Sequence, residues 1–248
     1  MHKGLVSYLL DSRDVERLFA DGEQLPSGYG IGFDERVVEY PWLFSQLRGG
    51  VVLDAGSTLN HEHVLDRFLP RIARLHVMTL APERVSFPER GVSYVYGDLR
   101  DIPYRDGYFD VVTAVSTLEH VGMDTRIYGV ASAPSGDPAG EVQKTVRELL
   151  RVLRRGGTFL ATVPYGARED HGWFRQLDRG DVDALMSCAP PRRAAVSVYR
   201  YTRRGWQLSS LDEAAGERYH DHHAYRHIPP DRAAAARAVA CLRFAPLD

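Results

Sequence analysis

The chain has 248 residues, of which 44% are hydrophobic and 26% are charged, and its formal net charge is -2. These values exclude collagen-like, coiled-coil and wholly disordered chains, and the length allows one large α/β domain or two small ones. The near-zero net charge argues against a protein that grips nucleic acid over a broad face, although it is compatible with a local basic patch.

The N-terminal residues 1–48 are expected to be largely helical. Apolar residues recur at helical spacing around Val15 and Phe19 and again from Val37 to Leu47, and the segment 26–32 between them is rich in glycine and predicts a loop. The apolar stretch that opens the chain is too short for a secretory signal, and no run of about eighteen apolar residues predicts a membrane span. We expect residues 29–36 to close as a lid over a binding site.

The middle of the chain alternates between apolar runs and helical patterns. Short runs rich in β-branched residues predict buried parallel strands at residues 51–53, 75–80, 109–115 and 158–163. Residues 92–96 alternate apolar and polar side chains, which is typical of an edge strand. Helical spacing occupies 61–69 and 141–153. This alternation predicts a doubly wound α/β domain with right-handed crossovers.

The C-terminal part is expected to complete the same sheet. Residues 131–140 predict a flexible insertion, residues 182–186 a short helix, and residues 194–201 and 239–244 two strands, with a turn at 203–205 between them. Cys188 and Cys241 lie near apolar segments, so we expect buried thiols of a cytoplasmic protein rather than a disulfide.

The predicted fold is therefore α/β, with a doubly wound, mostly parallel seven-stranded sheet, helices on both faces and one antiparallel strand near the C-terminus. We expect a single domain over 1–248, in which 1–48 form a helical lid, 49–165 the cofactor-binding core and 166–248 the substrate side. In such a sheet, ligands bind beyond the carboxyl ends of the strands.

Three segments carry a family resemblance. VVLDAGSTLN, YGDLRDIPYRDGYFDVVTAVSTLEHVG and VRELLRVLRRGGTFLATVPYG resemble, in this order and at the usual separations, the class I S-adenosylmethionine-dependent methyltransferases. The likeness covers roughly residues 50–165. It implies a Rossmann-like methyltransferase fold and S-adenosylmethionine as the cofactor.

The resemblance also implies where the cofactor lies. It places the methionine part over the turn after the first strand, the ribose at the end of the second strand and the adenine at the edge strand. The candidate cofactor-binding residues are Asp54, Ala55, Gly56, Ser57, Thr58, Asn60, Thr79, Leu80, Asp98, Leu99 and Ser116.

The sequence departs from the family pattern at three of these positions. Thr58 and Asn60 stand where the family usually has glycine, and we interpret Asn60 as a substitute because asparagine tolerates left-handed backbone. Thr79 stands where many members have an acid that binds the ribose hydroxyls, for which Glu83 is a substitute candidate. A structural turn without a ligand remains the alternative for the first loop.

Several histidines are candidates for a general base, because the pKa of imidazole lies near neutrality. His120 ends the LEH motif after the fourth strand, and His171 follows the fifth. His222 and His223 belong to a histidine-rich stretch at 220–227, for which a divalent metal site and an ordinary solvated loop are the alternatives. Imidazole suits divalent metal ions, so a metal is possible here, but it is not favoured.

We expect methyl transfer to a small molecule, with a hydroxyl of a sugar or of a secondary metabolite from natural product biosynthesis favoured over an amine or carbon. The alternatives are a binding or scaffold protein that keeps the fold with a degenerate cofactor site, and an RNA methyltransferase. The latter is less favoured because the Asp/Asn-Pro-Pro-Tyr/Phe motif of amino-directed nucleic-acid enzymes is missing. No nucleic-acid or membrane partner is expected, and a homodimer is left open.

Overall fold

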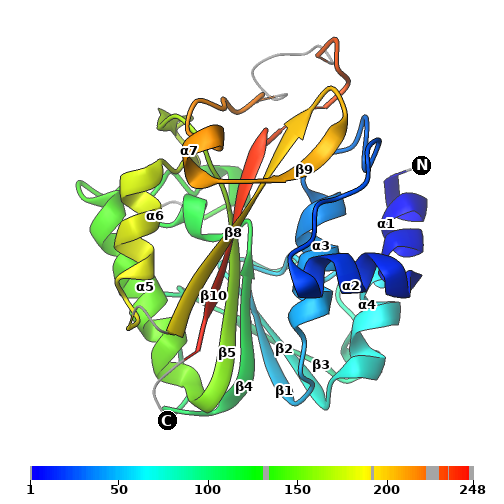
Figure 1. Ribbon diagram of the computed structural model, residues 1–248. Coiled ribbons are helices and arrows are strands. Elements are labelled where there is room, and N and C mark those ends of the chain that lie inside the picture. Colours follow the sequence, from blue (N-terminus) through cyan, green and yellow to red (C-terminus); the bar gives the residue numbers. More distant parts are fainter. Residues whose placement is uncertain (1, 131–133, 191–192, 222–228, 234, 246–248) are drawn as a thin grey trace.

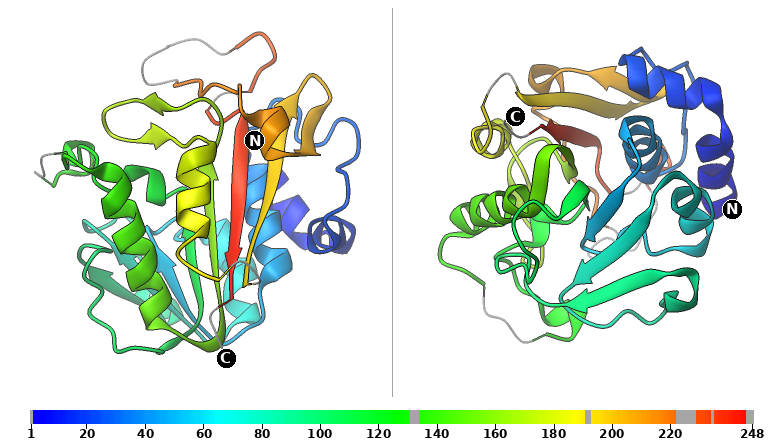
Figure 2. Two further views of the ribbon diagram at one scale, coloured as in Figure 1. Left: turned by 60° about the vertical axis from the view of Figure 1, so that its left-hand side comes forward. Right: turned by 90° about the horizontal axis from the view of Figure 1, so that it is seen from below.

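A computed structural model describes residues 2–130, 134–190, 193–221, 229–233 and 235–245, and an eight-stranded sheet runs through them (Figures 1 and 2). The strand order is β3-β2-β1-β4-β5-β10-β8-β9. The strands are β1 (Val51–Ala55), β2 (Arg74–Thr79), β3 (Val92–Tyr96), β4 (Phe109–Val115), β5 (Leu153–Pro164), β8 (Ala194–Thr202), β9 (Gly205–Ser209) and β10 (Ala238–Phe244). The first five pair in parallel, as the apolar runs predicted.

Two details of the predicted sheet are wrong. The sheet has eight strands rather than seven, because β9 follows β8 directly through a tight turn and pairs with it as a hairpin. In addition, two strands rather than one run against the parallel set, since β10 is antiparallel to both β5 and β8, and β9 is antiparallel to β8. The sequence GWQLS of β9 is short and contains only two large apolar residues, Trp206 and Leu208, so its pattern was too weak to predict a strand.

Helices cover both faces of the sheet, as expected (Figure 1). One side carries α1 (His2–Asp11), α2 (Arg13–Asp21), α3 (Arg36–Gln46) and α4 (Glu62–Phe68), and the other carries α5 (Pro138–Val152) and α6 (Arg179–Met186). Short elements complete the fold: β6 (Glu169–Asp170), β7 (Arg175–Gln176) and α7 (Leu211–Ala214). Contacts of α3 with β5 and β10, and of α5 with β5, hold the layers together.

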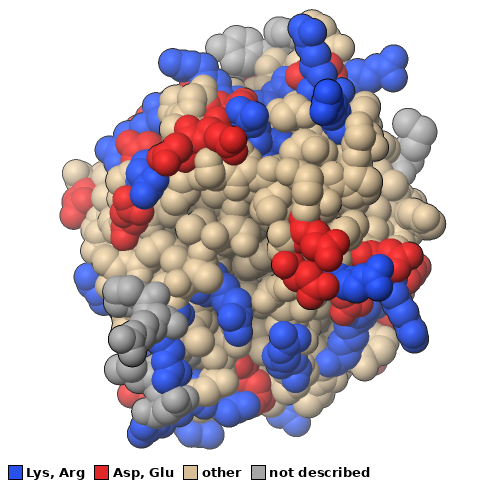
Figure 3. Space-filling view, viewed as in Figure 1, with Lys and Arg blue, Asp and Glu red and all other residues tan. Residues whose placement is uncertain are grey.

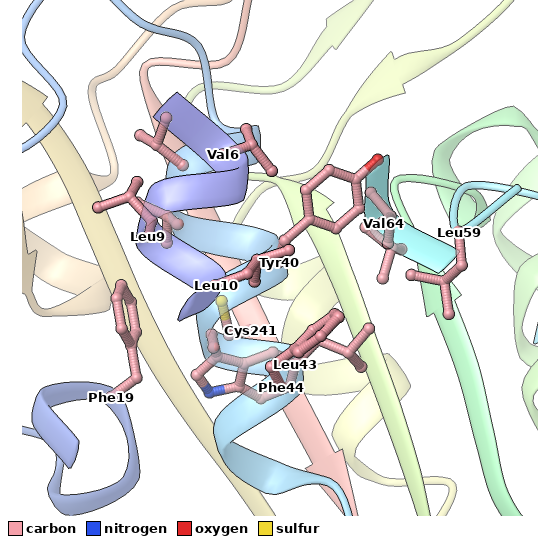
Figure 4. Close-up of a cluster of buried hydrophobic side chains, with 14 of the residues drawn as sticks. Val6, Leu9, Leu10, Phe19, Tyr40, Leu43, Phe44, Leu59, Val64 and Cys241 are labelled. Carbon is pink, nitrogen blue, oxygen red and sulfur yellow. The ribbon is translucent and has the colours of Figure 1, made fainter. Parts of the chain in front are cut away.

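The N-terminal helices are part of the main hydrophobic core (Figure 4). Leu9 and Leu10 of α1 and Leu43 of α3 lie in one buried cluster with Cys241 of β10. Full burial of such an aliphatic side chain contributes about 1.5–3 kcal/mol. Cys241 and the half-buried Cys188 are both free thiols, as expected.

The segment expected to act as a lid is bonded to the β8–β9 hairpin. The backbone N–H of Trp206 donates to the carbonyl of Tyr29 at 2.8 Å, and its indole N–H donates to the carbonyl of Phe33 at 3.1 Å. The N–H of Gly32 donates to the hydroxyl of Tyr201 at 2.9 Å. Opening as a lid would break these bonds, and the lid and the division into domains stay predictions.

The surface fits the near-neutral composition. On the face in Figure 3, acidic and basic side chains lie next to one another around a broad uncharged area, without a patch of a single sign. None of the helices in the described ranges is long and apolar enough to cross a membrane.

Candidate functional site

A pocket of ≈ 310 Å³ opens where the loops after β2, β3 and β4 converge. Parallel strands end on the same edge of a sheet, so these loops meet at the place where the fold predicts ligands. The pocket is lined by Gly56, Thr79, Leu80, Ala81, Pro82, Glu83, Asp98, Leu99, Arg100, Ser116, Thr117, His120, Val121, Gly122, Met123, Thr125, Tyr128 and Val130. Six of the eleven candidate cofactor residues are among them.

Asp54 lies beneath the turn that follows β1 and is fully buried. One carboxylate oxygen accepts the N–H of Leu59 at 2.9 Å, and the other accepts the hydroxyl of Thr113 at 3.2 Å. Burial raises the pKa of Asp54 to about 7. Asp54 and Ala55 are therefore placed behind the pocket wall, where Asp54 holds the turn.

Gly56 needs to be glycine for a reason that is independent of any ligand. Its φ is +105°, and a Cβ at this position would lie 2.1 Å from Oγ1 of Thr117. Ser57 follows with a φ of +68°, and its buried hydroxyl has no hydrogen-bond partner among the described residues. The left-handed backbone expected at Asn60 lies instead at Gly56 and Ser57.

The side chains of Thr58 and Asn60 bond within the protein. The Thr58 hydroxyl donates to the carbonyl of Val115 at 2.6 Å. The Asn60 amide donates to the carbonyl of Val85 at 2.8 Å and accepts the hydroxyl of Tyr94 at 2.7 Å. Neither lines the pocket, so the structure explains both residues as supports of the neighbouring loops.

The ends of β2 and β3 form the other wall. Thr79 and Leu80 line it together with Glu83, which lies in the loop between β2 and β3. Asp98 accepts hydrogen bonds from the guanidinium of Arg100, which also donates to Glu141 at 2.8 Å. Burial raises the pKa of Asp98, but the bonds from Arg100 outweigh it and leave that pKa below its ordinary value.

His120 belongs to a single 3-10 turn, Leu118–His120, that follows β4. Its Nδ1 lies 3.0 Å from the carbonyl oxygen of Trp173 and 3.1 Å from the hydroxyl of Tyr128. A carbonyl can only accept, so Nδ1 carries the proton and Nε2 keeps its lone pair. Burial lowers the pKa of His120 to about 4, which makes the ring neutral at pH 7.

Glu119 lies beside His120 with little access to solvent. Its Oε1 is 3.9 Å from Nε2 of His120, and its Oε2 has no hydrogen-bond partner among the described residues. Burial raises the pKa of Glu119 to about 8, with the charge of Glu39 as a smaller contribution to this rise. A protonated Glu119 next to a neutral imidazole is therefore the favoured state at pH 7.

His171 occupies a different place from His120. It stacks on Phe174 with ring centroids 4.4 Å apart and lines a second, open pocket with Trp173 on the β6–β7 hairpin. Its Nδ1 is 3.7 Å from Asp221 and its Nε2 is 3.9 Å from Glu169. The structure thus places His120, and not His171, at the main pocket.

The two remaining histidine candidates, His222 and His223, lie outside the described residues, as does most of the stretch 220–227. Within the described parts of the chain, no three His, Cys, Asp or Glu side chains gather closely enough to hold a metal ion.

Sequence reasoning missed several residues of the site. Arg100 and Tyr128 line the pocket without having been candidates. Glu39, which is fully buried on α3, bonds to Ser116 at the pocket. A signal for Glu39 was present, because a single acid within the apolar stretch VVEYPWLF predicts a buried charge that requires partners.

The residues present fit S-adenosylmethionine. The pocket offers Thr79, Glu83 and Asp98 as polar groups for a nucleoside and apolar walls from Leu80 and Leu99. The buried hydroxyl of Ser57, unpartnered within the described residues, follows the exposed backbone of Gly56 at the end where an amino-acid tail would lie.

Comparison with known proteins supports the resemblance seen in the sequence. Residues 55–161 match a family described as a methyltransferase domain. This match covers less than half of the chain and supports a class I S-adenosylmethionine-dependent methyltransferase domain over these residues. No curated protein matches the sequence.

Solved structures share the fold. The [4+2]-cyclase SpnF is 17% identical with a TM-score of 0.51, over 82% of this chain and 78% of that one. A SAM-dependent methyltransferase from Methanosarcina mazei is 13% identical with a TM-score of 0.50, over 84% and 99%. The 1,6-didemethyltoxoflavin-N1-methyltransferase of Burkholderia thailandensis, solved with S-adenosylhomocysteine, is 15% identical with a TM-score of 0.48, over 80% and 72%. At these identities the likeness to the first two structures establishes the fold alone.

Proposed function

We propose that the protein transfers the methyl group of S-adenosylmethionine to a hydroxyl of a small molecule, with His120 as the base. The observation that carries this proposal is the neutral His120 at the pocket, held by the Trp173 carbonyl so that Nε2 is free to accept a proton. General bases of this kind contribute about 10²–10⁴-fold to a rate.

The cofactor supplies an activated methyl group, so the protein has to align the acceptor, exclude water and receive one proton. Nε2 of His120 would accept the hydroxyl proton as the acceptor oxygen takes the methyl group, the carbon–sulfur bond breaks and S-adenosylhomocysteine leaves. Nδ1–H would stay hydrogen-bonded to the carbonyl of Trp173. The carboxyl group of Glu119, 3.9 Å from Nε2, lies beside the nitrogen that receives the proton.

The mouth of the pocket supports an apolar acceptor. Leu80 and Tyr128, which line it, are large apolar side chains that are 36% and 40% exposed. Exposed apolar groups at the rim of a site favour ligands with an apolar body. Such a mouth suits a secondary metabolite with one hydroxyl better than a sugar.

A binding protein with the same fold is the second candidate. The internal bonds of Thr58 and Asn60 favour it, because these side chains support loops and leave less backbone open to a cofactor tail. The fold itself does not decide, since a structure of this fold is named a [4+2]-cyclase.

Calorimetry with S-adenosylhomocysteine and a methyl-transfer assay with labelled S-adenosylmethionine test both candidates. We expect binding, and transfer to phenol- or alcohol-bearing apolar acceptors but not to their O-methylated analogues. Binding without transfer to any hydroxyl, amine or tRNA acceptor would favour the binding protein. The absence of heat at millimolar ligand would refute the proposed function.

A further inference from the structure

Ser116 has a rare backbone conformation and lies at the wall of the main pocket. It follows the last residue of β4, lines the pocket and begins the segment that carries His120. Its φ is +42°, in the left-handed region that non-glycine residues rarely adopt. Such backbone persists only where the surrounding structure enforces it, and it occurs preferentially at functional sites.

The groups that enforce it come from two elements, β5 and α3. The N–H of Ser116 donates to the carbonyl and to the hydroxyl of Thr162 on β5, at 3.0 Å and 3.1 Å. The Ser116 hydroxyl donates to Oε1 of Glu39 on α3 at 2.7 Å, and the Thr162 hydroxyl donates to the same oxygen at 2.6 Å. The other oxygen of Glu39 pairs with Arg36, one helical turn away.

Glu39 is 0% exposed in the middle of an apolar helix, which is costly for a carboxylate unless it has partners. Both oxygens have partners, and the two hydroxyls that it accepts belong to Ser116 and to the residue that binds the Ser116 amide. We propose that Glu39 is a positioning residue: it holds Ser116 in the left-handed conformation and thereby fixes the direction in which residues 117–120 leave β4.

This assignment gives α3 a function beyond packing. The turn that carries His120 begins two residues after Ser116, so a change of backbone angle at Ser116 moves the imidazole and the pocket wall together. Because the binding readout assumes that S-adenosylhomocysteine occupies the pocket, this part of the inference rests on the proposed function.

The test compares Glu39→Gln in the wild-type protein and in Ser116→Gly. Glycine adopts positive φ without steric cost, so a chain with glycine at 116 no longer needs to be held there. We expect Glu39→Gln to weaken S-adenosylhomocysteine binding about tenfold in the wild-type background, as the strain of such a residue implies. In the Ser116→Gly background the same substitution should weaken binding less than about twofold. Equal losses in both backgrounds would overturn the inference.

Glu35→Gln is the matched control. Glu35 is also buried, lies next to the start of α3 and forms no hydrogen bond to Ser116 in the described structure. Burial raises the pKa of Glu35 well above its ordinary value, which favours a neutral acid that glutamine resembles. Glu35→Gln should leave binding unchanged. A loss equal to that of Glu39→Gln would show that any buried substitution near α3 has this effect and would refute the assignment.

A measurement without ligand separates this inference from the proposed function. Hydrogen exchange of the Ser116 and His120 amides should be about tenfold faster in Glu39→Gln than in the wild type, at equal global stability. Unchanged exchange would overturn the inference. If the wild type binds no S-adenosylhomocysteine, the proposed function fails while the exchange result still decides the role of Glu39. Should Glu39→Gln not fold, Glu39→Asp, which keeps the charge and shortens the reach, carries the same comparisons.

Discussion

Replacing Asp54 by asparagine should change how the stability of the protein depends on pH. The pKa of Asp54 is raised by burial from 3.8 to about 7 in the folded state. A raised pKa means that the folded protein binds this proton more tightly than the unfolded chain does. The stabilisation by protonated Asp54 is therefore fully present below about pH 4 and is lost as the pH rises through about 7.

The size of the effect follows from these two values. Because the pKa of Asp54 rises from 3.8 to about 7 on folding, raising the pH from 5 to 8 should lower the free energy of unfolding by about 2.5 kcal/mol. The Asp54→Asn protein would lack this loss. The carbonyl of the new asparagine can accept the N–H of Leu59, as the carboxylate does. Its amide can donate to the hydroxyl of Thr113. That hydroxyl can in turn donate to the carbonyl of Leu53, which is 3.3 Å away.

Urea unfolding of both proteins at pH 5, 6, 7 and 8 measures this difference. The gap in unfolding free energy should move by about 2.5 kcal/mol in favour of Asp54→Asn between pH 5 and pH 8. Glu119, whose pKa is about 8, titrates in both proteins and cancels in the comparison. A gap that does not change with pH would refute the burial argument. A large loss of S-adenosylhomocysteine binding in a stable Asp54→Asn protein would show that the carboxylate itself contacts the cofactor.

Three further predictions address the pocket and the N-terminal segment. His120→Gln should lower the methyl-transfer rate by roughly 10²–10⁴-fold, because the base acts on the acceptor. The affinity for S-adenosylhomocysteine, measured by calorimetry, should change only a few-fold. A large loss of this affinity would instead place His120 on the cofactor. Thr79→Asp should bind S-adenosylhomocysteine about tenfold more tightly than Thr79→Asn, because a charge-assisted hydrogen bond contributes about 1.5–3 kcal/mol. Equal affinities would contradict the assignment of residue 79 to the ribose hydroxyls. Gly205→Ala should lower thermal stability by more than about 2 kcal/mol, since a Cβ there would lie 2.2 Å from the Tyr29 carbonyl. Gly91 has a similar φ but open space around it, so Gly91→Ala measures the backbone strain alone. An equal loss of stability in the two variants would contradict the steric argument.

The parallel half of the sheet could be predicted because burial on both faces produces continuous apolar runs, such as residues 109–115. The same argument failed for β9, which has only five residues and no continuous buried run. Its partner is fixed by a tight turn and by Trp206, which packs against the N-terminal segment. Information of that kind lies in contacts between distant parts of the chain and not in local periodicity.

The site was predictable in position and only partly in its residues. The topological rule located the pocket at the ends of β2, β3 and β4, and Asp98 and His120 indeed line it. The resemblance could not reveal that Thr58 and Asn60 bond internally, because a motif aligns residue types and not the direction of side chains. The apolar surroundings of Glu39 indicated a buried charge, but its partner could not be predicted, because Ser116 lies 77 residues away.

The arrangement around His120 bears on whether this chain is an enzyme or a binding protein. A protein that only binds a nucleoside needs Thr79, Asp98 and the apolar walls, but it gains nothing from a buried histidine with one nitrogen held by a carbonyl. Keeping that ring neutral and oriented has a cost, because burial lowers its pKa to about 4 and leaves Glu119 as a buried acid beside it. The strained Ser116 adds a second cost at the same turn. Two costly features in one short segment of the pocket wall are typical of a site in which a reaction is aligned, and they favour methyl transfer over binding alone.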